Sequence, residues 1–418
     1  MPFSTAAAKL EVGSISDTIK QQADAIVNAT VPLITPLLNF LVLTRDGDVL
    51  YQATAGTRQL GSLEPLRFND IFWLASHTKI LGVMSMLKCI DMGLISINDS
   101  VLTHLPDLAQ EQVRTDPNDP NSPTRPRVGD ITVRNLLTLT SGTAYPVVDF
   151  LATLNPTEIV LDPKPFFPSN ASVYQGSHAA DPNLIWRYGA EVDWLGLLVE
   201  KISGISLGNF IQTHILTPAG VPPSDFTFTL DAEQTARCVG QHVRVNDTLV
   251  VPRPPIYNHA NIQFESAGAG GFGTINALGQ ALLPIINGGR HPKTGKQILS
   301  PSIVKKMLQP QLSEIELNNG LNQPSQASKD GGVLFPGVPK QWGLGALLFP
   351  EGFAHTGRGD GTLAWAGFTN VNWHCDNEKG VVILAWSQLI PQDDPVFNNN
   401  TRYPIEKIVY DAIGNNYF

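Results

Sequence analysis

The chain has 418 residues, more than one hydrophobic core usually organises, so we expect two lobes or one core with a large insertion. Hydrophobic residues make up 42% of the chain and charged residues 16%, a balance that excludes wholesale disorder. The net charge of −9 argues against nucleic-acid binding, and the lack of a long apolar run argues against membrane insertion. With three cysteines and no recognisable secretory signal, we expect a cytoplasmic protein without disulfides.

The first hundred residues predict a helix, a hairpin and a buried helix. Residues 17–31 have amphipathic helical spacing. The apolar runs 40–44 and 49–53 flank a turn sequence of Arg, Asp and Gly, which indicates a β-hairpin. Residues 72–75 then lead into a helix that is apolar over much of its surface and that Gly93 is placed to end. We therefore expect that helix to be central and buried.

The rest of the chain changes from helices to strands. The proline-rich stretch 114–130 predicts a surface loop. Helical spacing follows at 132–139, 191–203 and 207–215. Near the end, apolar runs predict strands at 343–348, 363–373 and 381–386 and a terminal helix at 402–414. The last two of these strands are separated by a short turn, so we expect them to pair antiparallel.

Strands at both ends of the chain, with helices between them, predict an α+β fold. In this arrangement one antiparallel sheet is built from both chain termini and covered by helices, and a mostly helical domain is inserted in the middle. We expect the sheet domain to comprise residues 1–100 and 241–418, and the inserted domain residues 101–240.

The first candidate for chemistry is Ser76-His77-Thr78-Lys79, at the start of the buried helix. Residues three apart on a helix share a face, so Lys79 can reach the Ser76 hydroxyl. The helix N-terminus supplies backbone N–H groups that favour an anion, as a serine acyl intermediate needs. S-x-x-K also occurs by chance, as a capping serine followed by a solvated lysine. A lysine at the start of a buried helix is unusual for a purely structural residue, and this position favours a functional role for Lys79.

The second candidate is Tyr188, which lies just before the helix predicted at 191–203. A free phenol loses its proton only near pH 10, so this residue needs a cation such as Lys79 beside it to act as a base. The commoner role for a tyrosine is a packed ring with a solvated hydroxyl.

The third element should be a strand edge that offers a backbone N–H to an oxyanion. Three stretches compete for this role. Residues 293–295 read Lys-Thr-Gly but lie in a polar turn, and His355 precedes a glycine-rich turn that could border the site. Residues 365–368, Trp-Ala-Gly-Phe, lie within an apolar run predicted as a paired strand. The strand argument favours residues 365–368.

Other chemistries find less support. Residues 204–208 match G-x-S-x-G, but the helical spacing before them makes Gly204 a helix C-cap and Ser206 an N-cap rather than a nucleophile. No spacing of His, Cys or acidic residues indicates a metal, and no glycine motif in a suitable setting indicates a nucleotide, so we expect no cofactor. The glycine-rich run 268–273 predicts a loop that passes close to the site or to another backbone.

The order of these motifs resembles a known family. Ser76-x-x-Lys79, a tyrosine box and a late third box are typical of the serine β-lactamase and penicillin-binding-protein superfamily. The segments 131–145, 264–289 and 297–308 resemble the class C β-lactamase and family VIII carboxylesterase branch, and residues 361–367 resemble the W-G-G third box of its esterases. The tyrosine box at 186–201 is most similar to that of the lovastatin-type acyltransferases of fungi.

The resemblance implies a role for each matched residue. Ser76 would be the nucleophile, Lys79 its activator and Tyr188 the general base. The backbone N–H groups of Ser76 and Phe368 would form the oxyanion hole. Ala190 stands where β-lactamases have an asparagine, and Trp365 stands where they have the lysine of K-T-G. Both differences favour ester or thioester substrates over β-lactams.

The sequence thus predicts a serine acyl-enzyme catalyst, an esterase or acyltransferase acting on an ester or thioester of a hydrophobic metabolite, with fungal secondary metabolism as a setting. An acyl carrier protein is one candidate donor. The alternatives are a non-catalytic ligand-binding scaffold of the same fold and a D-amino-acid amidase or β-lactamase. Residues that could line the substrate site are Trp365, Gly367, His355, Tyr257 and Phe150.

Overall fold

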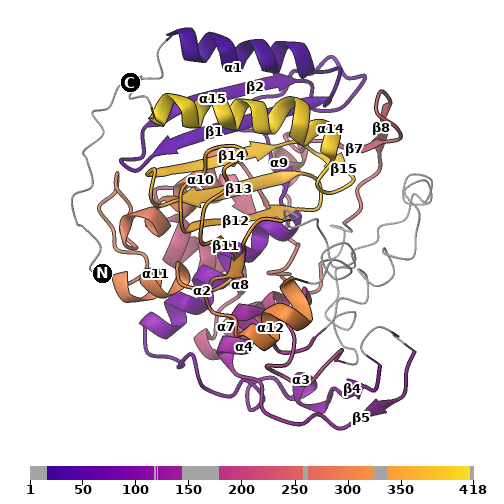
Figure 1. Ribbon diagram of the computed structural model, residues 1–418, viewed down its shortest axis with the longest axis vertical. Helices are drawn as coiled ribbons and strands as arrows, with labels where there is room; N and C mark the ends of the chain where they lie inside the picture. The colour runs from indigo at the N-terminus through magenta and orange to yellow at the C-terminus, as the bar shows by residue number, and fades with distance from the viewer. Residues whose placement is uncertain are drawn as a thin grey trace.

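A seven-stranded antiparallel sheet joins the beginning of the chain to its end in the computed structural model (Figure 1). The structure describes residues 17–116, 119, 121–143, 178–257, 262–322 and 337–414. In spatial order the strands are β10 (Gln341–Trp342), β11 (Leu347–Phe349), β12 (Thr362–Gly367), β13 (Val371–Asp376), β14 (Val381–Trp386), β1 (Leu37–Thr44) and β2 (Val49–Gly56). The pairing of β1 with β14 holds residues more than 300 positions apart side by side. This confirms the sheet built from both ends of the chain.

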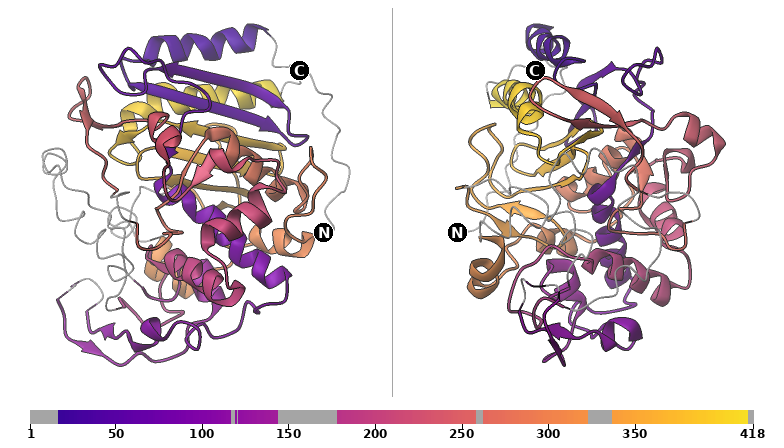
Figure 2. Two further views of the ribbon diagram at one scale, coloured as in Figure 1. Left: turned by 180° about the vertical axis from the view of Figure 1, so that it is seen from behind. Right: turned by 90° about the vertical axis from the view of Figure 1, so that its right-hand side faces the viewer.

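Strand β1 is almost wholly apolar because both faces of the sheet are covered. Its alternate side chains enter two separate cores, Leu37, Leu41 and Leu43 on one face and Leu38, Phe40 and Val42 on the other. Helices α1 (Asp17–Thr30) and α15 (Tyr403–Gly414) lie together over the second face. The first face packs against α10 (Ile275–Leu282) and the segment that leads into α2 (Lys79–Asp91), as Figures 1 and 2 show.

The turn directly before helix α2 contacts the sheet, and α2 itself packs against other helices. It is buried at ten of its thirteen positions, as its apolar surface predicts. Its main helical partners are α7 (Glu191–Ser203) and α8 (Leu207–Ile211). Among the helices in the described part of the chain, none is both long enough and apolar enough to cross a membrane.

Shorter elements complete the described structure. The other helices are α3 (Pro106–Gln110), α4 (Val133–Thr138), α9 (Ala232–Ala236), α11 (Pro301–Met307), α12 (Glu314–Glu316) and α14 (Pro395–Phe397). Two three-stranded sheets are formed by β15 (Leu389–Ile390), β7 (Gln241–Arg244) and β8 (Val250–Arg253), and by β3 (Phe72–Trp73), β9 (Phe272–Gly273) and β6 (Phe226–Thr227). Strands β4 (Val113–Arg114) and β5 (Thr124–Arg125) pair within the stretch predicted to be a loop.

The prediction of one strand over residues 363–373 is wrong. The run contains the end of β12, a turn and the start of β13, which pair antiparallel with each other. Asn370 makes the turn in a left-handed conformation, with φ of 57°, and its N–H donates to the Gly367 carbonyl. The prediction missed the turn because Thr369 and Asn370 lie within a run that is otherwise mostly apolar. The strand predicted at 343–348 is likewise interrupted, since Gly343–Gly345 form a turn between β10 and β11.

Candidate active site

Ser76 is the accessible point of a buried segment. It lies in the one-turn 3-10 helix η1 (Ala75–Thr78), directly before α2. Between residues 71 and 87 every residue is buried except Ser76, which is partly exposed. Ala75 before it has φ of 46°, a left-handed conformation that strains a residue with a side chain. The strained turn therefore presents the hydroxyl to a substrate while its neighbours stay in the core.

Lys79 and Tyr188 both contact the Ser76 hydroxyl, as predicted from sequence. The Tyr188 hydroxyl lies 2.6 Å from Ser76 Oγ and is hydrogen-bonded to it. Lys79 Nζ lies 3.4 Å from the same oxygen and 4.9 Å from the centre of the Tyr188 ring. Lys79 also donates to the Gly268 carbonyl at 2.7 Å. Because both side chains are almost completely buried, their interaction is little screened by water.

His77, beside the serine in sequence, faces away from the site. Its ring packs against Trp373 and Trp386. Neither ring nitrogen has a hydrogen-bond partner among the described residues, and burial holds the pKa of His77 well below its usual value. The imidazole is therefore neutral and packed in the core, whereas the phenol and the amine both contact Ser76 Oγ.

The segment before α7 fixes Tyr188. Arg187 N–H donates to the Leu139 carbonyl at 3.0 Å, and Trp186 N–H donates to the Glu316 carbonyl at 3.3 Å. Gly189 follows, where a Cβ would lie only 2.5 Å from the Thr143 carbonyl oxygen. The absence of a side chain at 189 lets the backbone pack this closely and brings the phenol to Ser76.

The end of β12 adjoins the turn that carries Ser76. Any Cβ on Gly367 would collide with the Leu74 carbonyl, so a glycine is required at this close approach. Phe368, which follows, is partly buried and packs against the main core. Ser76 is the second residue of η1, and the N–H groups at a helix start have no acceptor within the helix. This arrangement fits an oxyanion hole made by the N–H groups of Ser76 and Phe368, which stays a prediction.

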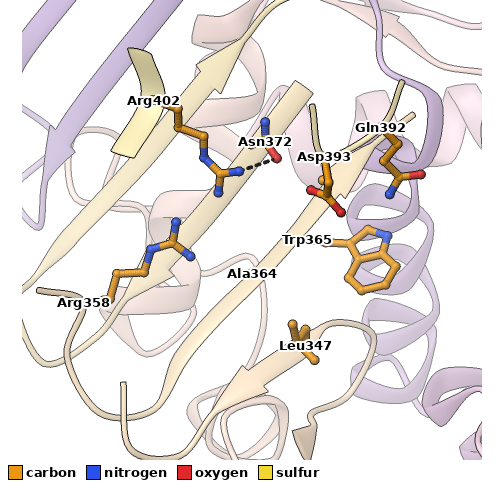
Figure 3. A pocket seen from close by; sticks show the side chains of 9 residues that line it. Leu347, Arg358, Ala364, Trp365, Asn372, Gln392, Asp393 and Arg402 are labelled. Carbon is orange, nitrogen blue, oxygen red and sulfur yellow. Dashed lines mark hydrogen bonds between the residues drawn. The ribbon is translucent and has the colours of Figure 1, made fainter. Parts of the chain in front are cut away.

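Trp365 packs against the ring of Tyr188. Its ring centre lies 5.2 Å from that of Tyr188 and 5.0 Å from that of Trp342. Trp365 also borders a cavity of about 20 Å³ between β12 and Arg402, whose guanidinium donates to Asn372 (Figure 3). A cavity of this size has room for about one water molecule but not for an acyl chain.

Two of the other predicted site residues, Tyr257 and His355, pack against aromatic side chains. Tyr257 is buried and stacks on Trp73, three residues before the serine, with ring centres 5.8 Å apart. His355 is exposed, and its ring packs against Phe353 and Tyr403 ahead of β12, so the structure does not bring it to Ser76. Phe150 lies outside the described residues. The predicted caps at Gly204 and Ser206 are confirmed, because Gly204 ends α7 and the Ser206 side chain accepts from Asn209 N–H at the start of α8.

Three residues of the site were not singled out from the sequence. Gly268 supplies the carbonyl acceptor for Lys79. Glu191 and Asp193 are wholly buried in the first turn of α7, close behind Tyr188. Glu191 and Asp193 could have been found as two acidic residues within an otherwise apolar helix pattern. Gly268 could have been found because it belongs to the glycine-rich run that was expected to pass close to the site.

Comparison with known proteins identifies the family. The Beta-lactamase family model matches residues 34–402. The chain belongs to the Beta-lactamase family. Monacolin J acid methylbutanoyltransferase of Aspergillus terreus is 30% identical over 375 residues, covering 87% of this chain and 89% of that protein. Lovastatin esterase of Penicillium rubens is 27% identical, covering 83% of this chain and 87% of the esterase.

A solved structure shows the same fold. Simvastatin synthase of Aspergillus terreus, in a mutant form, superposes with a TM-score of 0.80 at 26% identity, covering 97% of this chain and 100% of that one. Relatives within this part of the Beta-lactamase family transfer or hydrolyse acyl groups. The protein is an acyltransferase or esterase of the Beta-lactamase family.

Proposed function

We propose that this acyltransferase or esterase forms an acyl-enzyme on Ser76, with Tyr188 as base and Lys79 as the cation that sustains it. The observation that carries the proposal is the hydroxyl–phenol–amine cluster, with Tyr188 at 2.6 Å and Lys79 at 3.4 Å from Ser76 Oγ. The ammonium of Lys79 stabilises a phenolate at Tyr188, and the phenolate is a base strong enough to take the serine proton.

In the first half-reaction Ser76 Oγ attacks the carbonyl carbon of the acyl donor. Its proton moves to the Tyr188 oxygen as the new C–O bond forms. The carbonyl oxygen becomes an oxyanion, for which the N–H groups of Ser76 and Phe368 are the proposed donors. The bond to the leaving alcohol or thiol then breaks, and Tyr188 returns the proton to that leaving group.

In the second half-reaction an acceptor hydroxyl takes the place of the leaving group. Tyr188 accepts the proton of the acceptor, whose oxygen attacks the acyl-serine carbonyl. Collapse of the oxyanion breaks the bond to Ser76, which recovers a proton from Tyr188. Water as acceptor gives an esterase, whereas an alcohol gives an acyltransferase.

The substrate class follows from what surrounds the cluster. The ring of Trp365 packs against Tyr188 and is itself in contact with Trp342. A tryptophan at position 365 also leaves the site without the cation that the lysine of K-T-G would supply for a substrate carboxylate. We infer esters or thioesters of a hydrophobic metabolite in fungal secondary metabolism, as the named substrates of the relatives suggest. A small thioester or an acyl carrier protein is the candidate donor.

The test is turnover of a short-chain p-nitrophenyl ester and of a small acyl thioester, each with and without an alcohol acceptor. We expect Ser76→Ala to abolish both reactions. Ser206→Ala is the matched control, because it removes another helix-start serine, the one in G-x-S-x-G, and should keep full turnover. Full activity in Ser76→Ala, or nitrocefin hydrolysis faster than ester turnover, would contradict the proposal.

A further inference from the structure

Lys79 lies closer to a backbone carbonyl of a neighbouring loop than to the serine hydroxyl. The 2.7 Å bond to the Gly268 carbonyl is shorter than the 3.4 Å distance to Ser76 Oγ. Gly268 belongs to the run Ser266–Gly271, which contains three glycines and precedes β9. Glycine-rich backbone is free to adopt many conformations, so something must hold this carbonyl in place.

The carboxylate of Asp193 is one of the groups that hold the loop, and it is the one that bonds to Gly268 itself. Its Oδ1 accepts from the Ser266 hydroxyl at 2.6 Å and from the Gly268 N–H at 3.0 Å. Ser266 Oγ in turn accepts from the Ala269 N–H at 3.0 Å. Asp193 is 1% exposed, so these bonds form in a medium where water does not compete for the donors.

The same helix turn therefore serves two parts of the site. Tyr188 lies just before α7, and Asp193 lies in its first turn. The start of α7 thus fixes the position of the Tyr188 phenol and, through Gly268, the position of the carbonyl that accepts from Lys79. Ala267 packs against α2 and α7 where Gly82 and Gly196 leave room for it, which brings the loop close to both helices.

We propose that Asp193 is a positioning residue for the acyl-transfer reaction: by accepting from the Ser266 hydroxyl and the Gly268 N–H it places the Gly268 carbonyl, which holds Lys79 at Ser76 and Tyr188. The inference rests on the proposed function of those three residues. The hydrogen bonds that Asp193 accepts come from Ser266 and Gly268, so we expect its effect to reach the reaction through Gly268 and Lys79.

The test compares two substitutions at Asp193. Asp193→Ala removes the acceptor, and we expect kcat for ester turnover to fall about 100-fold, the effect of a displacement near 1 Å, with little change in KM. Asp193→Asn keeps an oxygen in the same place that accepts from both donors, so it should recover most of the lost kcat. Rates of Ser76 acylation by an activated ester should follow the same order.

Glu265→Gln is the matched control. Glu265 also joins the segment before β9 to a helix, by accepting from Gly208 N–H of α8 at 2.5 Å, but it does not contact Lys79 or its acceptor. It should keep kcat near the wild-type value. If Asp193→Ala does not fold, Ser266→Ala removes one of the two anchors and should lower kcat more than Glu265→Gln does.

The outcomes separate the two proposals. Wild-type kcat in Asp193→Ala, a change in KM alone, or an equal loss in Glu265→Gln would overturn the positioning role. Those results leave the proposed function standing as long as Ser76→Ala is inactive. If Ser76→Ala keeps its activity, the proposed function fails and the role of Asp193 fails with it.

Discussion

At Ser76 the nearest basic groups are a phenol and an amine, because the neighbouring His77 is enclosed by tryptophans. The arrangement separates this site from serine hydrolases in which an imidazole takes the proton. The proposed function divides the roles between two residues, with the phenol, which lies closer to the serine, as the base and the amine as the cation.

Tyr188→Phe tests that division. The substitution removes the hydroxyl but keeps the ring that packs on Trp365. Because a general base contributes about 10²–10⁴-fold, we expect kcat to fall by about that factor, with the thermal midpoint almost unchanged. Steady-state kinetics and thermal unfolding measure the two effects. Activity within a few-fold of the wild-type value would show that the phenol is not the base.

Glu191 gives the site a pH-dependent stability. Its Oε1 accepts from the Ser141 hydroxyl at 2.9 Å, and Oε2 has no partner among the described residues. Burial raises the pKa of Glu191 to about 8, although hydrogen bonds from Thr143 and Ser141 and the nearby charge of Lys79 oppose the rise. The folded protein therefore keeps this proton over a range in which the unfolded chain, with an ordinary pKa of 4.5, has released it.

The difference between the folded and unfolded pKa values of Glu191 fixes the direction in which stability changes with pH. The stability associated with Glu191 is fully present below pH 4.5 and is lost as the pH rises to about 8. Glu191→Gln cannot ionise, so its thermal midpoint relative to the wild type should rise between pH 5 and pH 8. Glu265→Gln serves as the control, because Glu265 is partly exposed, and its thermal midpoint relative to the wild type should change less with pH. A midpoint difference for Glu191→Gln that is constant with pH, or that falls, would refute the explanation.

At the scale of elements, the contact between β12 and η1 brings the third motif to the nucleophile. Gly367→Ala would place a methyl group against the Leu74 carbonyl and the Val371 side chain. We expect a loss of about 1–3 kcal/mol in the free energy of unfolding and, because β12 must move away from Ser76, a large fall in acylation rate. Denaturant unfolding and the rate of Ser76 labelling measure these effects.

Gly279→Ala is the control for general overpacking. Gly279 lies on α10 against Leu41 and Leu43, and an added methyl group would be tight there as well. This variant should lose a similar amount of stability but acylate at the wild-type rate once folded. If both variants acylate at that rate, β12 does not supply part of the oxyanion hole.

The sequence predicted those elements whose pattern is local. Helix α7 and the hairpin of β1 and β2 have clear periodicity or turn residues, and both are confirmed. The left-handed turn at Asn370 was missed because it lies within a run of mostly apolar residues. For the site, the motif residues Ser76, Lys79 and Tyr188 were found, but Gly268 and Asp193 act through backbone groups, and no side-chain pattern reveals which carbonyl a lysine will meet.

For the whole molecule, a buried ion network ties the C-terminal helix to the sheet. Glu406 of α15 accepts from Arg358 at 2.7 Å and from Arg402 at 2.9 Å, and Arg402 also donates to Asn372 of β13. Burial alone would raise the pKa of Glu406, but the two guanidinium charges outweigh it and lower this pKa to about 2. Loss of one partner would leave uncompensated charge in the core.

We therefore expect Glu406→Gln to lower the free energy of unfolding at pH 7 by about 3–5 kcal/mol. The stability from the ionised Glu406 is present above pH 4.5 and is lost as the pH falls toward 2, so the gap between variant and wild type should narrow over that range. Denaturant unfolding at several pH values measures it. Asp411→Asn, in the exposed pair with Lys407 on the same helix, should cost at most about 1 kcal/mol. An equal effect of the two substitutions would contradict the buried network.

The most direct measurement of the central claim is the mass of the protein caught between the two half-reactions. After brief incubation with a small acyl thioester and an acid quench, intact mass spectrometry should show one added acyl group. Peptide mapping should place it on Ser76, and an alcohol acceptor added before the quench should remove it. Turnover without any adduct, or an adduct on a different residue, would contradict acyl transfer through Ser76.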